Sequence, residues 1–261
     1  MPTSRQAVAN RYGKIADYEN TRLATHPMER ELTLRAIHQA LDTSETADIE
    51  RKRIADVGGG PGKIAFALAD QGHHVDLIDL SPDLIRLAEL EQNQRSASAK
   101  NPALLASISE TERKKAVENV LRLAKPQRGL IFCAFVSKEA HLRDVAMRDP
   151  ARLVKQKDFY AAYLADGRYE RLNESLEAEV QSFHTDSGSI RGFFQRHFTD
   201  VAELISLRST EGILGGGLDA KLIDADSEVV EAWADLLFSE YSEKEEYLGC
   251  ADHLLTVLRK K

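Results

Sequence analysis

The residue types between positions 56 and 79 could bind a nucleoside cofactor. Asp56 leads the run Gly58-Gly59-Gly60-Pro61-Gly62, and Asp79 lies 23 positions after Asp56. Glycines lack a Cβ, so a ligand can lie directly against their backbone. Such a ligand binds beyond the carboxyl ends of parallel strands, where a carboxylate ending the second strand can accept both hydroxyls of a ribose. The alternative is a glycine-rich loop that only joins a strand to a helix and binds nothing.

The elements that would position these residues are predicted from apolar periodicity and turn signals. Ser81 is a suitable N-cap residue and Pro82 suits the first helical position, so a helix is expected to follow the second strand. In chain order, the earlier elements are a helical segment over 3–41, a polar linker over 42–52, a strand over 53–57, a helix over 64–69 and a strand over 74–80.

The second half of the chain continues this mixture of helices and strands. Ser109 and Glu112 fit a capping box that would open a helix. The almost wholly apolar run 130–136 predicts a strand buried on both faces. The remaining expected elements are a charged, mostly helical insert over 138–196, strands over 201–207 and 252–258, a mobile glycine loop at 215–217 and a helix over 229–237.

Two cofactor classes use a glycine turn of this kind. A dinucleotide fingerprint GxGxxG that starts at Gly58 would need a third glycine at position 63, which is Lys63. The acidic-x-Gly-x-Gly-x-Gly form led by Asp56 instead resembles motif I of the class I S-adenosylmethionine-dependent methyltransferases. This resemblance implies S-adenosyl-L-methionine as the cofactor. The cofactor-binding residues that it implies are Asp56, Gly58, Gly59, Gly60, Gly62, Asp79, Leu80 and Tyr12.

The resemblance extends over most of the chain, although only motif I and Asp79 are specific. The segment with Tyr12, Ala16 and Tyr18 is similar to the N-terminal helix that covers the cofactor in many small-molecule methyltransferases. Residues 117–132 look like the family's late helix, turn and fifth strand, and residues 251–258 look like its closing strand. By this resemblance Asp56 and the turn lie beside the methionine portion, and Asp79 binds the ribose.

The implied fold is α/β, a Rossmann-like methyltransferase sheet with three αβα layers and a helical cap insert. One domain would span 1–261. Its parts would be an N-terminal helical cover over 1–52, a cofactor-binding core over 53–137, the cap over 138–196 and C-terminal strands and a helix over 197–261.

The middle of this fold looks shortened. Two strand–helix repeats need on the order of 60 residues, whereas 81–128 holds about 48. Only 103–108 could form a third strand, and the family's fourth strand has no candidate. We therefore expect the strand at 130–136 to pair directly beside the strand at 53–57.

The functional hypotheses follow from these features. The first is a methyltransferase that acts on a small-molecule acceptor. The second is a non-catalytic descendant, a pseudoenzyme or inactive isoform, that binds cofactor or a partner. The third, a nicotinamide-dependent oxidoreductase, is disfavoured by Lys63.

No catalytic residue is assigned. His141 and His184 are possible bases, but a structural role is more common for such histidines. The aromatic residues of 159–194 could line an acceptor pocket or, more often at helical spacing, form core. No HExxH motif or Cys/His cluster predicts zinc, and Asp224 and Asp226 fit a solvated turn better than a metal site, so we expect no metal.

Composition limits the partners and the location. A formal charge of −7 and a pI near 5.7 argue against a nucleic-acid binder. No run approaches the roughly 18 apolar residues of a membrane span, and the N-terminus shows no signal-peptide core. Cys133 and Cys250 form no CxxC and are expected to be reduced and buried, which favours a cytoplasmic protein. The oligomeric state is left open.

Overall fold

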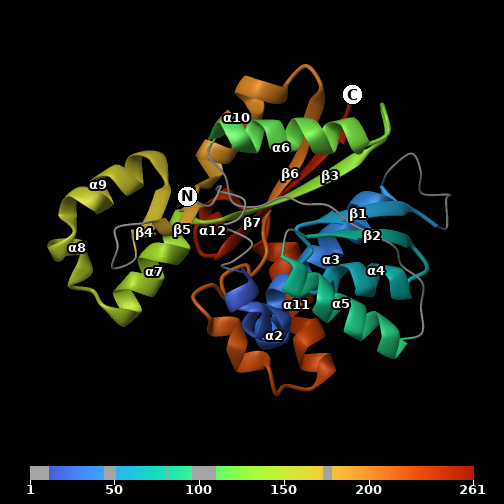
Figure 1. Cartoon of the computed structure of the whole chain (residues 1–261), viewed down its shortest axis with the longest axis horizontal. Helices are drawn as coiled ribbons and strands as arrows, with labels where there is room; N and C mark the ends of the chain where they lie inside the picture. The colour runs from blue at the N-terminus through green and yellow to red at the C-terminus, as the bar shows by residue number, and fades with distance from the viewer. Residues whose placement is uncertain (1–11, 44–50, 80, 96–109, 173–177) are drawn as a thin grey trace. The chain divides into compact units, whose positions relative to one another are not determined.

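The computed structural model describes residues 12–43, 51–79, 81–95, 110–172 and 178–261 (Figure 1). The helices are α2 (Ala16–Thr25), α3 (Pro27–Asp42), α4 (Lys63–Asp70), α5 (Pro82–Arg95), α6 (Glu110–Leu123), α7 (Lys138–Arg148), α8 (Arg152–Lys155), α9 (Lys157–Asp166), α10 (Ser187–Phe198), α11 (Ser227–Glu240), α12 (Glu245–Leu248) and the 3-10 helix η1 (Leu218–Leu222). The strands are β1 (Arg53–Val57), β2 (His74–Ile78), β3 (Leu130–Val136), β4 (Arg168–Leu172), β5 (Ala178–Phe183), β6 (Ala202–Ser209) and β7 (His253–Lys260).

The chain divides into two compact units. The first unit consists of Met1–Thr25, Ala47–Ile108 and Glu170–Gln181. The second unit consists of His26–Thr46, Ser109–Tyr169 and Ser182–Lys261. The glycine turn therefore belongs to the first unit.

The first unit contains a β-α-β motif. β1 and β2 pair in parallel with Asp56 opposite Leu77, and α4 connects them and packs on β2. The expected N-cap of α5 is confirmed, because the Oγ of Ser81 accepts the backbone N–H of Leu84 at 3.4 Å and Pro82 is the first helical residue. The first strand has the predicted bounds, whereas β2 begins at His74 as predicted and ends at Ile78, before the predicted end at residue 80.

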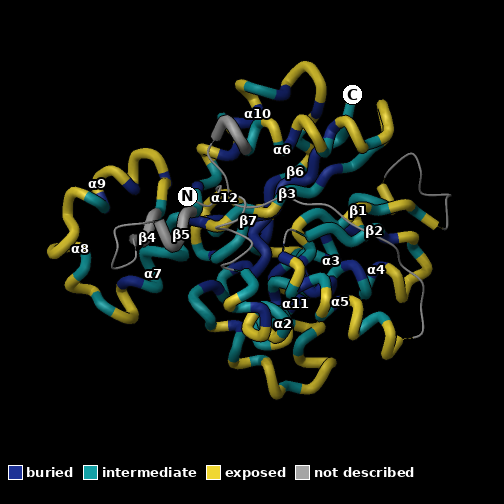
Figure 2. Tube along the Cα trace, in the orientation of Figure 1, coloured by how far each residue is buried: buried dark blue, intermediate teal, exposed yellow. Residues whose placement is uncertain are grey.

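A three-stranded antiparallel sheet forms the centre of the second unit, with β7 between β3 and β6. Five consecutive residues of β7, from Leu254 to Leu258, are buried (Figure 2). Since successive side chains of a strand point to opposite faces, both faces of the sheet are covered at β7. The expected strands over 201–207 and 252–258 are confirmed.

Helices supply the two covering layers of this sheet. On one face, α6 and α10 pack with Leu254 and Leu258 of β7 in one core cluster. The helix α3 contacts β3 and β7, and its Met28 and Leu32 pack with Ala234 and Leu237 of α11. The second unit therefore has the helix–sheet–helix layering that an α/β fold needs.

Several expectations for the second half are corrected. β3 is not buried on both faces, because it lies at the edge of its sheet and only Ile131 is buried, whereas β7 takes the central place. β3 pairs with β7 and β1 pairs with β2, so the expected pairing of 130–136 beside 53–57 is wrong among the described residues.

The insert also differs from the expectation. It contains the strand pair β4–β5 as well as helices, and Phe193 and Phe194 of α10 belong to the core of the three-stranded sheet. The glycine loop at 215–217 is anchored rather than mobile. A Cβ on Gly215 would lie 2.0 Å from the carbonyl oxygen of Cys250, and the backbone N–H of Gly216 donates to Asp252 at 2.8 Å.

Some expected segments lie outside the described residues. These are 3–11 of the helical segment, most of the polar linker, the capping residue Ser109 and the candidate third strand at 103–108. Among the described residues, no strand lies between α5 and α6.

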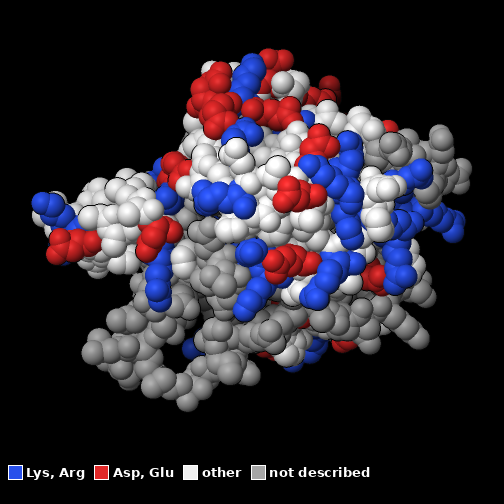
Figure 3. Space-filling model, turned by 90° about the horizontal axis from the view of Figure 1, so that it is seen from above, with Lys and Arg blue, Asp and Glu red and all other residues white. Residues whose placement is uncertain are grey.

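Basic and acidic side chains both lie on the face shown in Figure 3, in keeping with a modest net charge of −7.

Within the described part of the chain, no helix has the length and apolar character that crossing a bilayer requires.

Shortening a central side chain of β7 should destabilise the protein strongly. Leu254 is 1% exposed, so Leu254→Ala removes packed methyl groups and leaves a cavity, which we expect to cost about 2–5 kcal/mol. Urea denaturation followed by circular dichroism measures this cost. The matched control Leu123→Ala, at a position 72% exposed, should change the unfolding free energy by less than about 0.5 kcal/mol. Equal effects of the two variants would contradict the sheet arrangement.

Candidate functional site

The glycine turn joins β1 to α4 through a backbone that side chains would disturb. Gly58, Gly60 and Gly62 have φ angles of 78°, 56° and 83°, in the left-handed region that favours glycine. The backbone N–H groups of Gly58 and Gly59 donate to the carbonyl oxygen of Ile78 at 2.6 and 3.2 Å. The turn is therefore tied to the end of β2.

The turn also lies directly over side chains of the two strands. A Cβ on Gly59 would lie 2.4 Å from Cδ1 of Leu77 and 2.5 Å from Oδ2 of Asp56, so a larger residue would force these side chains to shift. At Gly60 the nearest atom to such a Cβ is Cδ1 of Leu84 at 3.8 Å, which leaves space of atomic size beside the backbone. Among the described residues, only the Leu84 side chain comes within 4 Å of this position at Gly60.

Asp79 faces the turn from the end of β2. Its Oδ2 accepts the backbone N–H of Gly60 at 2.8 Å, and its Oδ1 accepts that of Ser81 at 2.8 Å. Each carboxylate oxygen has a second lone-pair site, so both can still accept a hydroxyl. The sequence-based expectation that Asp79 stands beside the glycine turn agrees with this geometry.

Asp56 lies beneath the turn. Its Oδ2 is buried and has no hydrogen-bond partner, while the carboxylate accepts the backbone N–H of Ala65. Burial raises the pKa of Asp56 to about 6, opposed by the Ala65 hydrogen bond and aided by the negative charge of Asp79. Because this oxygen is fully covered, its missing donor is a cost of burial within the fold and does not mark a contact for a ligand.

The remaining predicted cofactor residues are Tyr12 and Leu80. Leu80 lies outside the described residues. Tyr12 is helical and partly buried, and a Cβ on the adjacent Gly13 would lie 2.5 Å from Oδ2 of Asp83. The N-terminal segment therefore lies against the first turn of α5, which starts three residues after Asp79.

The histidines and aromatic residues of the insert pack against one another. Both ring nitrogens of His184 are hydrogen-bonded, Nδ1 to the hydroxyl of Tyr163 at 2.8 Å and Nε2 to the hydroxyl of Ser182 at 3.1 Å. His141 lies 4.6 Å from the ring of Tyr169, centroid to centroid, and burial together with the charge of Arg152 lowers its pKa. These contacts favour the structural role over the base role.

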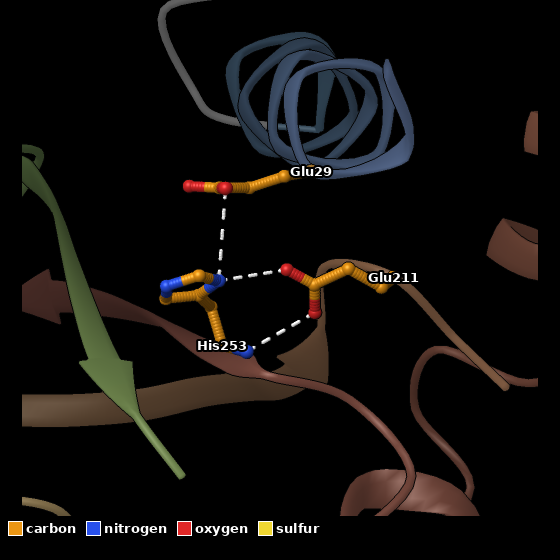
Figure 4. A group of neighbouring side chains, drawn as sticks. All are labelled: Glu29, Glu211 and His253. Atoms are coloured by element: carbon orange, nitrogen blue, oxygen red, sulfur yellow. Dashed lines mark hydrogen bonds and ion pairs between the residues drawn. The ribbon is translucent and has the colours of Figure 1, made fainter. Parts of the chain in front are cut away.

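The structure brings together one group that the sequence did not predict. Glu29, Glu211 and His253 meet in the second unit (Figure 4). The three residues are separated by 182 and 42 positions and belong to no short motif, so spacing gave no signal.

Comparison with known proteins identifies the fold. No family model matches the chain. A stretch of 47 residues is 47% identical to the ubiquinone biosynthesis O-methyltransferase of Xylella fastidiosa. The match covers 18% of this chain and 19% of that enzyme's length.

Solved structures match over almost the whole chain. An S-adenosylmethionine-dependent methyltransferase of Clostridium acetobutylicum aligns over 95% of this chain and 98% of its own, with a TM-score of 0.51 and 8% identity. A chain of a Haloferax volcanii complex between a methyltransferase activator and a candidate methyltransferase aligns over 97% and 96%, with a TM-score of 0.50 and 14% identity. The chain has the α/β, Rossmann-like fold of the S-adenosylmethionine-dependent methyltransferases.

The buried carboxylate of Asp56 should make stability depend on pH. Its folded pKa of about 6 lies above the ordinary 3.8, so the folded state loses stability as pH rises through this range. The variant Asp56→Asn has no charge at this position. Its unfolding free energy relative to that of the wild type should therefore rise by roughly 1.4 kcal/mol between about pH 5 and about pH 7.5. Urea denaturation at the two pH values measures the difference.

The control for this experiment is Asp235→Asn. The Asp235 side chain is 75% exposed, so its removal releases no buried charge. The difference in unfolding free energy between Asp235→Asn and the wild type should therefore be the same at the two pH values. A constant difference between Asp56→Asn and the wild type at both pH values would show that Asp56 carries no burial penalty.

Proposed function

We propose that this chain is an S-adenosylmethionine-dependent methyltransferase that acts on a small-molecule acceptor. The observation that carries the proposal is the contact between Asp79 and Gly60, which joins an acidic strand end to a glycine turn that lacks side chains. The fold of the methyltransferase neighbours supports it. The short stretch similar to a ubiquinone biosynthesis O-methyltransferase supports a small-molecule acceptor.

The residues of the turn fit the cofactor. The backbone of Gly58–Gly62 would lie beside the methionine portion, Asp79 would accept the ribose hydroxyls, and the segment with Tyr12 would cover the site. Two features of the structure support this fit: the space beside the Gly60 backbone and the carboxylate of Asp79 next to it.

Methyl transfer needs little from the protein beyond the correct positioning of cofactor and acceptor. When bound, the cofactor supplies an electrophilic sulfonium methyl group. The turn, Asp56 and Asp79 hold and orient the nucleoside, and alignment of reacting groups alone lowers a barrier by several kcal/mol. A general base is needed only for an acceptor that starts protonated. Because both ring nitrogens of His184 are hydrogen-bonded, we do not assign His184 as a general base.

The length of the chain between α5 and α6 favours a second candidate, a non-catalytic descendant that binds cofactor or a partner. α5 ends at Arg95 and α6 begins at Glu110, which leaves only residues 96–109 for everything between them. Residues 81–128, which include α5 and α6, number about 48, whereas two strand–helix repeats of a complete methyltransferase need on the order of 60. The residues that flank the methyl group in relatives come from this region.

Calorimetry separates these candidates from a nicotinamide enzyme. We expect saturable binding of S-adenosylhomocysteine and no binding of NAD, because Lys63 replaces the third glycine and its Nζ pairs with Glu91 at 2.8 Å. A methyl-release assay with phenolic and other small acceptors then divides catalyst from non-catalytic binder. If NAD binds and S-adenosylhomocysteine does not, both candidates are contradicted.

Removal of the Asp79 carboxylate should weaken cofactor binding. Asp79→Ala removes the acceptor assigned to the ribose, and we expect the Kd for S-adenosylhomocysteine to rise at least about tenfold, measured by calorimetry. Asp79→Asn, which keeps one acceptor for the backbone of the turn, should also bind weakly.

The matched control is Asp76→Asn, on the same strand but paired with Arg53 at 3.1 Å rather than with the turn. It should bind as the wild type does. If both Asp79 variants keep wild-type affinity and circular dichroism, the ribose role of Asp79 is wrong.

A further inference from the structure

Three side chains of types that commonly bind metal ions lie close together in the second unit. The Nδ1 atom of His253 lies 2.7 Å from Oε1 of Glu211 and 3.6 Å from Oε2 of Glu29. All three ligand atoms lie within 4.8 Å of one another (Figure 4). Glu29 lies in the first turn of α3, Glu211 follows β6, and His253 is the first residue of β7.

Two carboxylates face one imidazole in this cluster. The Glu211 side chain is 4% exposed; burial raises its pKa, against the attraction of His253, and the nearby charge of Glu29 raises it further. A divalent cation placed between the three side chains would attract both carboxylates.

The second oxygen of Glu211 is already fixed. Its Oε2 accepts the backbone N–H groups of Asp252 and His253, both at 3.0 Å, which directs Oε1 toward the imidazole. Asp252 is held in turn by Arg143 at 2.7 Å. Metal-binding carboxylates are commonly oriented by hydrogen bonds of this type.

A neighbouring carboxylate adds to the negative charge. Asp219 is 1% exposed, its Oδ1 lies 2.9 Å from Nδ1 of His26, and its Oδ2 is buried without a hydrogen-bond partner. Its charge interacts with that of Glu29. Asp219 therefore adds negative charge near Glu29, but it is paired with His26 and is not one of the three ligands.

We propose that Glu29, Glu211 and His253 bind one divalent transition-metal ion, Zn²⁺ or Mn²⁺. One imidazole and two carboxylates suit these ions. With bonds of roughly 2.0–2.2 Å, tetrahedral ligand atoms stand about 3.3–3.6 Å apart. The Glu29 oxygen, 3.6 Å from Nδ1 of His253, is within this range, and the Glu211 oxygen, at 2.7 Å, would have to move away from the imidazole.

The ion takes the place of the proton between the imidazole and Glu211. Nδ1 must be deprotonated to bind, so affinity falls as pH falls. The side chains of His253 and Glu29 are 27% and 15% exposed, which leaves a path for the ion and for a water ligand. All three ligands belong to the second unit, whereas the proposed cofactor turn belongs to the first.

Calorimetry on the metal-stripped full chain tests the site directly. Titration with ZnCl₂ and with MnCl₂ should show one saturable site for at least one ion, and the bound ion should raise the Tm. Glu29→Gln should weaken binding at least about tenfold. The matched control Glu31→Gln, on the same helix but paired with Arg30 and Arg35, should bind as the wild type does.

A second measurement avoids dependence on a variant that fails to fold. In the Mn²⁺-loaded wild type, pulsed EPR should detect coupling to one imidazole nitrogen, and His253→Asn should remove it. Absence of saturable binding by both ions, equal affinity of a folded Glu29→Gln for the ion that binds, or a spectrum of saturably bound Mn²⁺ without nitrogen coupling would each overturn the proposal. S-adenosylhomocysteine binding is measured in parallel, so failure of the metal site is distinguished from failure of the proposed function.

Discussion

The hydrogen bond from the backbone of Gly60 to Asp79 is the constraint on which the first unit depends. It closes the turn after β1 onto the end of β2, and it does so only because the glycines accept positive φ angles. Asp56 lies beneath the same turn, so two carboxylates share a small volume. The repulsion between them is one cause of the raised pKa of Asp56.

The two proposed sites use the chain differently. The cofactor turn is built from residues close in sequence, and its geometry follows from a strand, a glycine run and a helix in succession. The cluster of Glu29, Glu211 and His253 instead depends on tertiary packing of α3 against β7. The first site lies in one unit and the second in the other, so each can be altered without a change to the other's residues.

Features that depend on residues close in sequence could be predicted, whereas features that depend on contacts between distant residues could not. Local signals were sufficient for β1, α4, β2 and the cap at Ser81, because turn chemistry and periodicity act within a few residues. The burial of Leu130–Val136 was misjudged, because an apolar run does not say whether it lies at the centre or the edge of a sheet. The pair β4–β5 was missed because its residues lie in a charged stretch without an apolar period. Residues far apart in sequence, such as Glu29 and His253, could not be joined without the fold.

The pairing of β3 with β7 sets how the second unit folds. Leu130 pairs with Arg259 and Val136 with His253, so more than a hundred residues separate the two partners along the chain. Closing so long a loop costs entropy before any sheet contact compensates for it, which slows folding. Until β7 inserts, β3 and β6 both present open edges that other chains can join. Refolding yield should therefore fall with protein concentration, and molecular chaperones that shield strand edges would matter more for this unit than for the β1–α4–β2 motif.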